Sequence, residues 1–435
     1  MSGGRALAVA VPSWNGRHHL ETCLAALAEQ EDPGVPWSVL VCDNGSRDGT
    51  AEWVRSRHPR VRLLESPVNL GFCAANNRLA RMAAEQGADA VAFLNNDTRP
   101  ERGWLRGLHQ ALAAAPADVA AVSGLIVDWE RERLDFARGV MTFDGHALQL
   151  GFRRPLSRAT AAEVPPAGAE LPFGCGGNLL VRLEAFERAG GFDETYFAYY
   201  EDVDLGWRLW AGGGRVLFAP AAVVRHRSSA SSDRLGLYNR GFLFERNALL
   251  TAYKNYEPEL WDRIMPAVLL TFLARTQALL VHHNPGGDLL ALDPYAGLIA
   301  DTGGTPSGAA ARAGWLEKWR RHGTAEFLRR AARKAGRLLA GQAGQVPVLS
   351  DERTQAQLRA AASFLRHLDQ AAAARTAVQA RRRRGDRDYF ARFPPYLIPT
   401  YPGDEELFAR PGFAQWLPSD FPLVRARLCD LMETE

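Results

Sequence analysis

A dense group of ionisable side chains in this 435-residue sequence is the run YYEDVDLGWR at residues 199–208. Its three carboxylates fall at the start of a predicted helix, where negative charge interacts favourably with the helix dipole. Three carboxylates are more than the start of a helix needs for capping, so one of them can serve as a general base beside a substrate hydroxyl. Asp204 and Arg208 are i,i+4 partners, which makes Asp204 the structural member. Glu201 and Asp202 remain as the candidate catalytic pair.

Polar side chains directly follow three predicted strands, in the segments Pro12-Ser13-Trp14-Asn15, Asp43-Asn44-Gly45-Ser46 and Asn95-Asn96-Asp97. In open parallel sheets, ligands bind beyond the carboxyl ends of the strands. A carboxylate at Asp43 can accept the imide N–H of uracil or thymine. The competing interpretation of that segment is a turn, because Asp-Asn-Gly is strong turn chemistry.

The third segment has the chemistry of a cation site. Its oxygen side chains suit a hard divalent ion such as Mg²⁺ or Mn²⁺, which keeps waters and binds substrate phosphates through few carboxylates. Asp97 is its only charged member, and a polar loop or a helix cap is the competing interpretation. His226 ends a strand-like run and is therefore a candidate metal ligand, although a lone histidine is more often a packed or surface residue.

Residues 174–178, Gly-Cys-Gly-Gly-Asn, form a glycine-rich segment. It lacks the Lys-Ser/Thr of a Walker loop. It is either a turn before a strand or a loop in which Gly176 and Gly177 let the backbone approach a sugar or diphosphate closely.

Strand and helix patterns alternate up to residue 127, which predicts right-handed crossovers and a largely parallel sheet. The predicted strands are 7–11, 39–42, 61–64, 90–94 and 119–127, and the predicted helices are 16–29, 50–57, 72–86 and 101–115. We expect Asp48 to cap the second helix and Pro100 to stand in the first turn of the fourth. Residues 128–175 predict loops and short hairpins.

The sequence is mostly helical in pattern from residue 235. The apolar stretch 264–281 contains Pro266, Arg275 and Gln277, which favours a buried or interfacial helix over a membrane span. The proline- and aromatic-rich tail 392–422 predicts an ordered wrap against another domain.

Composition narrows the class of protein. The chain is 47% hydrophobic and 23% charged, as in soluble globular proteins, and its net charge of +3 gives no argument for nucleic acid. Arginines gather at 329–337 and 381–384. They form a solvated helical face or, alternatively, contact an anionic partner such as a lipid surface. The five scattered cysteines predict reduced thiols in a cytoplasmic protein, and the apolar run 7–11 is too short for a signal peptide.

The order of the motifs closely resembles family 2 of the inverting glycosyltransferases, which have the GT-A fold. The motifs are VPSWN at 11–15, DNGS at 43–46, NLGF at 69–72, NND at 95–97 and EDVD at 201–204. Within that family the chain looks like bacterial rhamnosyltransferases and galactofuranosyltransferases of cell-surface polysaccharide assembly. The resemblance extends to about residue 230, with helical similarity through Arg246-Asn247. It predicts an α/β GT-A nucleotide-diphospho-sugar transferase domain at 1–234 and a mostly helical domain at 235–435 for acceptor, membrane or oligomer contacts.

The resemblance also implies roles for individual residues. The nucleotide and diphosphate would be bound by Pro12, Trp14, Asn15, Asp43, Asn76, Asn77, Asn95, Asn96, Gly176 and Gly177. Asp97 would occupy the last position of the metal-binding triplet, and His226 would complete a Mg²⁺ or Mn²⁺ site. Asp202, beside Glu201, would take the proton of the acceptor hydroxyl in a single displacement that inverts the anomeric configuration.

The implied donor is a UDP- or dTDP-sugar, and the implied acceptor is a saccharide or a lipid-linked saccharide. We also expect peripheral contact with the inner face of the cell membrane and homo-oligomer formation. Binding of nucleic acid is not expected, because the late arginines lack interleaved aromatics. The alternatives are a retaining enzyme, a nucleotidyltransferase, and a non-catalytic nucleotide-sugar or carbohydrate-binding module. The Glu-Asp-x-Asp helix after a glycine-rich loop argues against a nucleotidyltransferase, and the full set of carboxylates argues against a decayed site.

Overall fold

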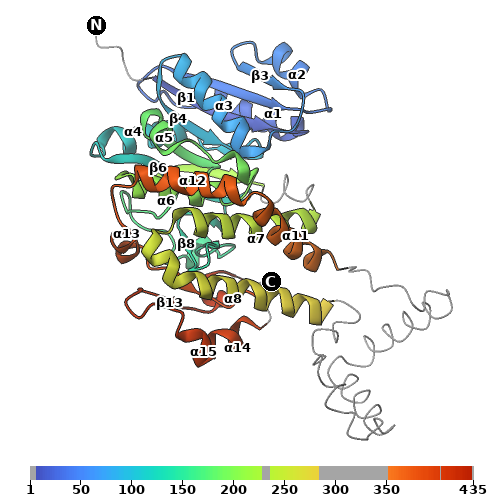
Figure 1. The fold of residues 1–435 in the computed structure, drawn as a ribbon. Helices are drawn as coiled ribbons and strands as arrows, with labels where there is room; N and C mark the ends of the chain where they lie inside the picture. The colour runs from blue at the N-terminus through green and yellow to red at the C-terminus, as the bar shows by residue number, and fades with distance from the viewer. Residues whose placement is uncertain (1–5, 228–235, 284–350, 402, 434–435) are drawn as a thin grey trace, which may run out of the picture.

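A computed structural model describes residues 6–227, 236–283, 351–401 and 403–433. Its centre is a nine-stranded sheet in the order β3-β2-β1-β4-β10-β6-β11-β5, with β7 also paired to β6 (Figure 1). The strands are β1 (Ala6–Ser13), β2 (Trp37–Asn44), β3 (Arg62–Ser66), β4 (Ala88–Leu94), β5 (Thr98–Pro100), β6 (Val119–Asp128), β7 (Leu134–Phe136), β10 (Asn178–Arg182) and β11 (Arg215–His226).

The sheet is parallel in its first half and mixed in its second. Strands β3, β2, β1 and β4 are parallel neighbours, as the alternating pattern predicted. Strand β10 runs antiparallel to both β4 and β6, and β5 runs antiparallel to β11. A parallel connection needs a crossover of a dozen or more residues, usually helical. The chain instead reaches β10 through the hairpin region predicted at 128–175, which contains β8 (Gly139–Met141) and β9 (Ala147–Gln149).

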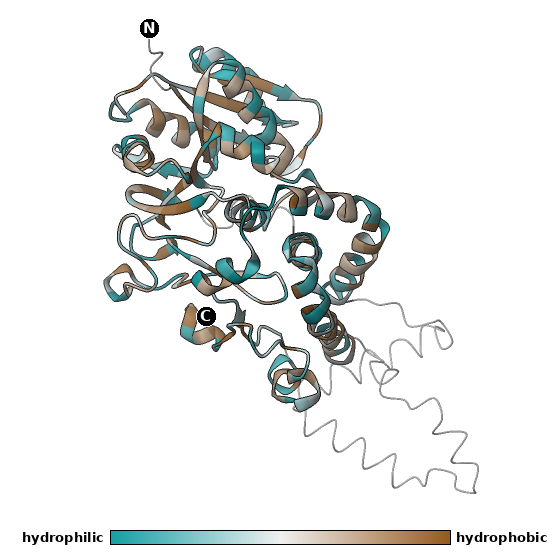
Figure 2. Cartoon of the chain, turned by 60° about the vertical axis from the view of Figure 1, so that its left-hand side comes forward, coloured by the Kyte–Doolittle hydropathy of each residue, from teal (hydrophilic) through white to brown (hydrophobic). Residues whose placement is uncertain are grey.

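Helices cover both faces of the sheet. One core is built by α1 (Arg17–Ala28), α2 (Thr50–Arg57) and α4 (Trp104–Ala114), and the other by α3 (Gly71–Glu85), α5 (Leu183–Ala189) and α6 (Glu201–Ala211). The strands are mostly hydrophobic, while the helices carry both hydrophobic and hydrophilic residues (Figure 2). The predicted α/β class with a mostly parallel sheet flanked by helices is therefore confirmed, apart from the direction of β10 and β5.

Two local predictions were wrong. Pro100 ends β5, where it pairs with Val224, and α4 begins only at Trp104. Proline has no N–H to donate to a ladder, and it is tolerated in β5 because this strand lies at the edge of the sheet. The N-cap position of α2 is Gly49, with φ 77°. Asp48 instead accepts the backbone amides of Arg17 (3.0 Å) and Thr50 (3.2 Å) and so ties the starts of α1 and α2 together.

The helical region after residue 235 packs against the first part of the chain. It contains α7 (Gly236–Asn255), α8 (Pro258–His283), α11 (Glu352–Arg366), α12 (Leu368–Arg381), α13 (Asp386–Arg392), α14 (Asp404–Ala409), α15 (Pro411–Ala414), α16 (Leu428–Leu431) and the strands β12 (Tyr396–Leu397) and β13 (Val424–Arg425). In the tail, Phe393 contacts Trp210 at a ring-centroid distance of 5.1 Å, and Phe408 contacts Phe143 at 6.0 Å. These contacts confirm the predicted wrap. The domain boundary predicted at 234/235 lies outside the described residues.

Helix α8 is, within the described ranges, the one helix whose length and composition would allow it to cross a membrane, over Pro258–Leu280. Its Arg275 is buried, and the guanidinium contacts Asp144 at 2.8 Å and Asp404 at 3.1 Å. We therefore interpret α8 as a helix packed against the rest of the protein through its charged residue, in line with the expectation for 264–281.

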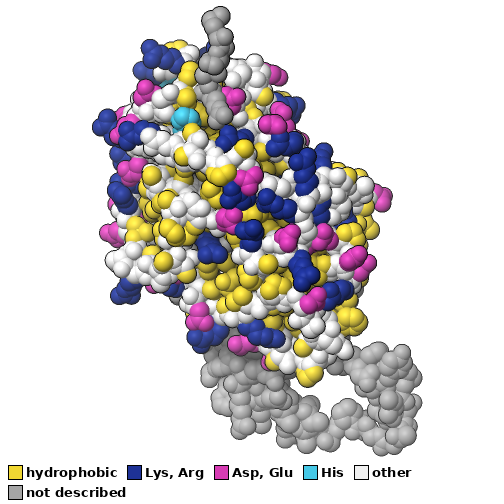
Figure 3. Space-filling model, turned by 90° about the vertical axis from the view of Figure 1, so that its left-hand side faces the viewer, with side chains coloured by type: hydrophobic (Ala, Val, Ile, Leu, Met, Phe, Trp, Pro, Cys, Tyr) yellow, Lys and Arg dark blue, Asp and Glu magenta, His cyan; other side chains and the backbone are white. Residues whose placement is uncertain are grey.

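The arginines of the described residues do not form a single basic surface. The cluster at 329–337 lies outside the described residues. Arg382 forms an ion pair with Asp386 (3.0 Å), and Arg384 lies over Trp210, 5.5 Å from the ring centroid, so only Arg381 and Arg383 are solvated as expected. On the face seen in Figure 3, basic and acidic side chains are interspersed, with hydrophobic side chains between them.

A buried charged group joins the β8–β9 turn to the C-terminal helices. His146 lies between two carboxylates, with its Nδ1 3.2 Å from Asp144 and its Nε2 3.2 Å from Glu245 of α7. Arg275 and Tyr401 complete the surroundings, since Arg275 contacts Asp144 and the Tyr401 hydroxyl donates to Glu245 at 2.8 Å. Burial lowers the pKa of His146, but the two carboxylates outweigh it and raise this pKa to about 9.

This group predicts a loss of stability at alkaline pH. Because the folded-state pKa of His146 lies above its unfolded value of 6.5, the stabilisation is complete below pH 6.5 and is lost as pH rises through about 9. The shift corresponds to roughly 3 kcal/mol. We expect the free energy of unfolding of the native chain to fall between pH 6.5 and 9 relative to His146→Gln, measured by urea titration. Parallel pH profiles for the two proteins would contradict the assignment.

Candidate active site

The polar segments predicted at the strand ends meet at the carboxyl edge of β1, β2 and β4. Ser13 and Asp43 are register partners on β1 and β2. The Asn15 amide donates to Ser46 Oγ at 2.8 Å, and Asn96 Nδ2 donates to Ser13 Oγ at 3.0 Å. These bonds join all three segments, as expected from the parallel order of the strands. Pro12 and Trp14 lie half-buried on the same edge.

Asp43 has both a turn contact and a place at this edge. It is 6% exposed, and its carboxylate accepts the Ser46 amide at 3.2 Å, so the turn interpretation describes a real contact. Next to it, Asn44 donates to Asn69 Oδ1 at 3.0 Å and to the Gly71 carbonyl at 3.1 Å. The NLGF segment is thereby fixed beside the strand end. Recognition of a base by Asp43 stays a prediction.

The glycine-rich loop lies between two predicted site segments. The Gly176 amide donates to Asp202 Oδ2 at 3.1 Å. A Cβ added to Gly177 would lie 2.8 Å from Asn95 Nδ2, so a larger residue there would displace the Asn95 side chain. The loop thus contacts the candidate base on one side and the Asn-Asn-Asp segment on the other. Sequence reasoning expected this loop to approach a ligand and missed its contact with Asp202.

The adjacent carboxyl groups of Glu201 and Asp202 have different surroundings. Burial raises the pKa of Asp202, opposed by the amides of Gly176 and Val203. Burial raises the pKa of Glu201 well above its usual value, and the charge of Asp202 adds to the effect. Glu201 Oε2 is also buried without a hydrogen-bond partner. The surroundings of Glu201 therefore favour its protonated form, whereas Asp202, which is partly exposed and accepts two amide hydrogen bonds, is the better candidate for the base.

Asp204 has the structural role expected for it. It forms ion pairs with Arg208 (2.6 Å) and Lys254 of α7 (2.8 Å), and it is fully buried. These cations hold the pKa of Asp204 below its usual range against the opposing effect of burial. Its charge is thus used to join α6 to α7 and is not available to a substrate.

Asp97 and His226 are brought together by strand pairing. His226, the last residue of β11, is the register partner of Thr98 in β5, and its Nε2 lies 3.4 Å from Asp97 Oδ1. Its Nδ1 contacts Asp135 Oδ2 of β7 at 2.9 Å. Burial lowers the pKa of His226, but Asp135 and Asp97 outweigh it and raise this pKa to about 10. The imidazole thus lies between two carboxylates that attract positive charge.

The donor set at Asp97 and His226 fits a divalent ion of the kind that a substrate helps to bind. The described part of the chain contains no cluster of three or more His, Cys, Asp or Glu side chains that could hold a metal. An ion bound by Asp97 and His226 would therefore take its other ligands from diphosphate oxygens and water, as Mg²⁺ commonly does. A metal-binding histidine usually contacts a carboxylate through its second nitrogen, and Asp135 has this position beside His226. Sequence analysis missed Asp135.

Asn76 and Asn77 have structural contacts on α3. Asn77 donates to the Phe192 carbonyl at 2.8 Å and accepts the Phe192 amide at 2.9 Å. Asn76 donates to the Phe72 carbonyl at 3.1 Å, and its Oδ1 is buried without a partner. Their predicted place beside a diphosphate stays a prediction.

Comparison of the sequence with known proteins shows the family of this chain. The family model described as glycosyl transferase family 2 matches residues 8–190. An N-acetylglucosaminyl-diphospho-decaprenol L-rhamnosyltransferase of Mycobacterium tuberculosis is 35% identical over 246 residues, which cover 52% of this chain and 78% of the relative. The chain belongs to glycosyl transferase family 2. The predicted family and its rhamnosyltransferase-like character are thereby confirmed.

Another curated protein and a solved structure are also similar to this family 2 member. A pre-mycofactocin glycosyltransferase of Mycobacterium tuberculosis is 33% identical over 191 residues, covering 43% of this chain and 37% of the relative. A solved mannosyltransferase of Pyrobaculum calidifontis, in complex with GDP-Man and Mn²⁺, is similar with a TM-score of 0.43 and 19% identity, covering 82% of this chain and 86% of that one. The matched family model ends at residue 190, before Asp202 and His226.

Proposed function

We propose that this family 2 glycosyltransferase moves a sugar, rhamnose-like or another hexose, from a UDP- or dTDP-sugar to an acceptor hydroxyl with inversion. The observation that carries the proposal is the position of the Gly176–Gly177 loop. It contacts Asp202 through an amide hydrogen bond and packs against Asn95, next to Asp97 and its partner His226. A base and a cation site on two sides of one loop are the two groups that sugar transfer from a diphosphate needs.

The chain's own groups account for the proton transfer. Asp202, held by the amides of Gly176 and Val203, takes the proton from the acceptor hydroxyl as the oxygen attacks the anomeric carbon. The new carbon–oxygen bond forms while the bond to the diphosphate oxygen breaks, and the diphosphate leaves with the electron pair. Protonated Glu201 adds no second negative charge near the base. A divalent ion bound to Asp97 and His226 would supply the charge that stabilises the departing diphosphate.

The acceptor is inferred from the relatives. The Mycobacterium tuberculosis rhamnosyltransferase is named for a diphospho-decaprenol-linked N-acetylglucosamine. We extend this chemistry to the present chain as a saccharide or lipid-linked saccharide acceptor in bacterial cell-surface polysaccharide or glycolipid synthesis. Contact with the inner face of the cell membrane from the cytoplasm would then bring the enzyme to such an acceptor. Homo-oligomer formation remains a prediction.

The donor is tested by a hydrolysis screen across UDP-, dTDP- and GDP-sugars, with Mg²⁺ and Mn²⁺. Uracil and thymine offer the same imide N–H to Asp43, so we expect turnover of UDP- or dTDP-sugars. Asp43→Asn keeps an oxygen for the Ser46 amide and loses the carboxylate for the imide. We expect it to raise the KM for the donor by about 10- to 100-fold with little change in kcat.

Three results would oppose the proposal. Turnover of GDP-sugars alone would contradict the proposed donor, and an unchanged KM in Asp43→Asn would remove Asp43 from base recognition. Binding of a nucleotide sugar without cleavage under either metal would favour a non-catalytic binding module.

A further inference from the structure

The segment before the catalytic helix has an unusual backbone. Three of its bulky residues have positive φ: Phe197 (64°), Tyr199 (70°) and Tyr200 (64°). Phe197, with ψ −59°, is the centre of a γ-turn closed by the Ala198 amide on the Tyr196 carbonyl at 2.7 Å. Such turns are rare and strained. Bulky residues keep positive φ only where their surroundings impose it.

Two adjacent residues of α7 impose this conformation. The Nδ2 of Asn247 donates to three backbone carbonyls of the segment, those of Tyr196 (3.1 Å), Ala198 (2.9 Å) and Tyr199 (2.7 Å). Asn247 is fully buried. The amide therefore spans the γ-turn and reaches the residues directly before α6.

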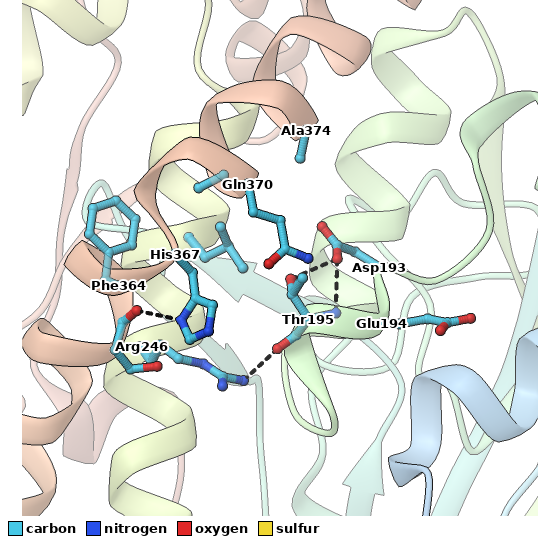
Figure 4. A pocket seen from close by; sticks show the side chains of 11 residues that line it. Asp193, Glu194, Thr195, Arg246, Phe364, His367, Gln370 and Ala374 are labelled. Carbon is cyan, nitrogen blue, oxygen red and sulfur yellow. Dashed lines mark hydrogen bonds between the residues drawn. The ribbon is translucent and has the colours of Figure 1, made fainter.

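Arg246 completes the clamp. Its Nη2 donates to the carbonyls of Thr195 and Tyr196, both at 2.8 Å, and the bond to Thr195 is visible in Figure 4. The same guanidinium donates to Asn247 Oδ1, with distances of 2.9 Å from Nε and 2.8 Å from Nη2. Because this bond engages the oxygen of the Asn247 amide, the Nδ2 is directed at the segment. A cavity of about 310 Å³ lies beside Arg246 and the Thr195 loop.

The clamped segment is attached at both ends to the candidate active site. The Phe197 carbonyl accepts the amides of Phe72 (2.7 Å) and Cys73 (3.3 Å) at the start of α3. Gly71 lies so close to Phe197 that an added Cβ would be 2.5 Å from its ring. On the other side, Tyr200 is the N-cap of α6, which begins with Glu201 and Asp202.

We propose that Arg246 and Asn247 are positioning residues that hold the 196–200 segment in its strained form and thereby aim Asp202 at the acceptor hydroxyl. The proposal rests on the proposed function, since it assigns a role to residues outside the family model for the same reaction. Neither residue touches the reacting atoms. A displacement of about 1 Å at a reacting group can lower the rate about 100-fold, so small relaxations of this segment suffice.

The test compares Asn247→Ala with a matched control, Gln379→Ala. Gln379 of α12 also donates through its amide to three backbone carbonyls, those of Lys254 (3.2 Å), Asn255 (3.5 Å) and Tyr256 (3.2 Å), at the far end of α7. Three quantities are measured on the full chain: kcat, the Kd for the nucleotide sugar, and hydrogen exchange of the amides at 197–203. The strained segment should relax only in Asn247→Ala.

For Asn247→Ala we expect kcat to fall about 100-fold, the donor Kd to change less than threefold, and exchange at 197–203 to accelerate at least tenfold. Gln379→Ala should keep native kcat and native exchange in that segment. Unchanged kcat or unchanged local exchange in Asn247→Ala would overturn the proposal. So would equal losses in both variants, which would indicate a general loss of structure. If the native chain cleaves no donor, the proposed function fails, while the exchange measurement still decides whether Asn247 holds the segment.

Discussion

Asp202→Asn should lower kcat for sugar transfer by about 10²- to 10⁴-fold, which is the contribution of a positioned general base. The asparagine has the same shape and keeps an oxygen to accept the Gly176 amide, so the loop between base and cation site should stay in place. The Kd for the nucleotide sugar should therefore change little. The measurement is kcat at saturating donor and acceptor, together with donor binding by calorimetry.

Glu201→Gln is the matched control, because it changes the neighbouring carboxyl group in the same way. Burial and the charge of Asp202 raise the pKa of Glu201 and favour its neutral form, which a glutamine amide would reproduce without a change of charge. We expect activity within about tenfold of the native enzyme, below the range for loss of a base. A larger loss in Glu201→Gln than in Asp202→Asn would assign the base to Glu201.

Asp97→Asn should weaken Mn²⁺ binding by more than about 100-fold in the presence of a nucleoside diphosphate. Asp97 would be the charged ligand of the proposed site beside His226, so little protein affinity would be left without it. Mn²⁺ binding is followed by electron paramagnetic resonance, which is independent of activity. Transfer measured at low metal concentration should fall in parallel.

Asp135→Asn provides the graded comparison. Asp135 reaches His226 through Nδ1 at 2.9 Å and would not touch the ion, and loss of such an outer partner typically costs 10- to 100-fold in metal affinity. We therefore expect the order native, Asp135→Asn, Asp97→Asn in falling affinity. Native Mn²⁺ affinity in Asp97→Asn would exclude this residue as a ligand.

Short-range patterns predicted most of the first half of the fold. Helix 50–57 was predicted with its observed ends, and strands and helices up to residue 94 were placed within a few residues, because hydrophobic periodicity decides such elements. Pro100 was misplaced because a proline before a helical pattern suits either a first helical turn or an edge strand. The pairing of β5 with β11, which is tertiary, decides between them.

The candidate site was predictable only where each residue carries its own signal. Asp202, Asp97 and His226 stand in motifs, and the structure places the last two in contact. Asp135 carries no such signal, because its place beside His226 follows from the β6–β7 hairpin. The bond between Gly176 and Asp202 and the clamp of Asn247 connect segments far apart in the chain. Their partners are set by the packing of α6 and α7, which no local pattern encodes.

The stereochemistry of the product tests the central claim most directly. Proton NMR during turnover of the donor found in the screen, with diamagnetic Mg²⁺, reports the anomeric configuration of the sugar as it is transferred or released. Attack by an acceptor oxygen activated at Asp202 predicts the opposite configuration to that of the donor, with product forming about 10²- to 10⁴-fold more slowly in Asp202→Asn. A product that retains the donor configuration would contradict single displacement at this site.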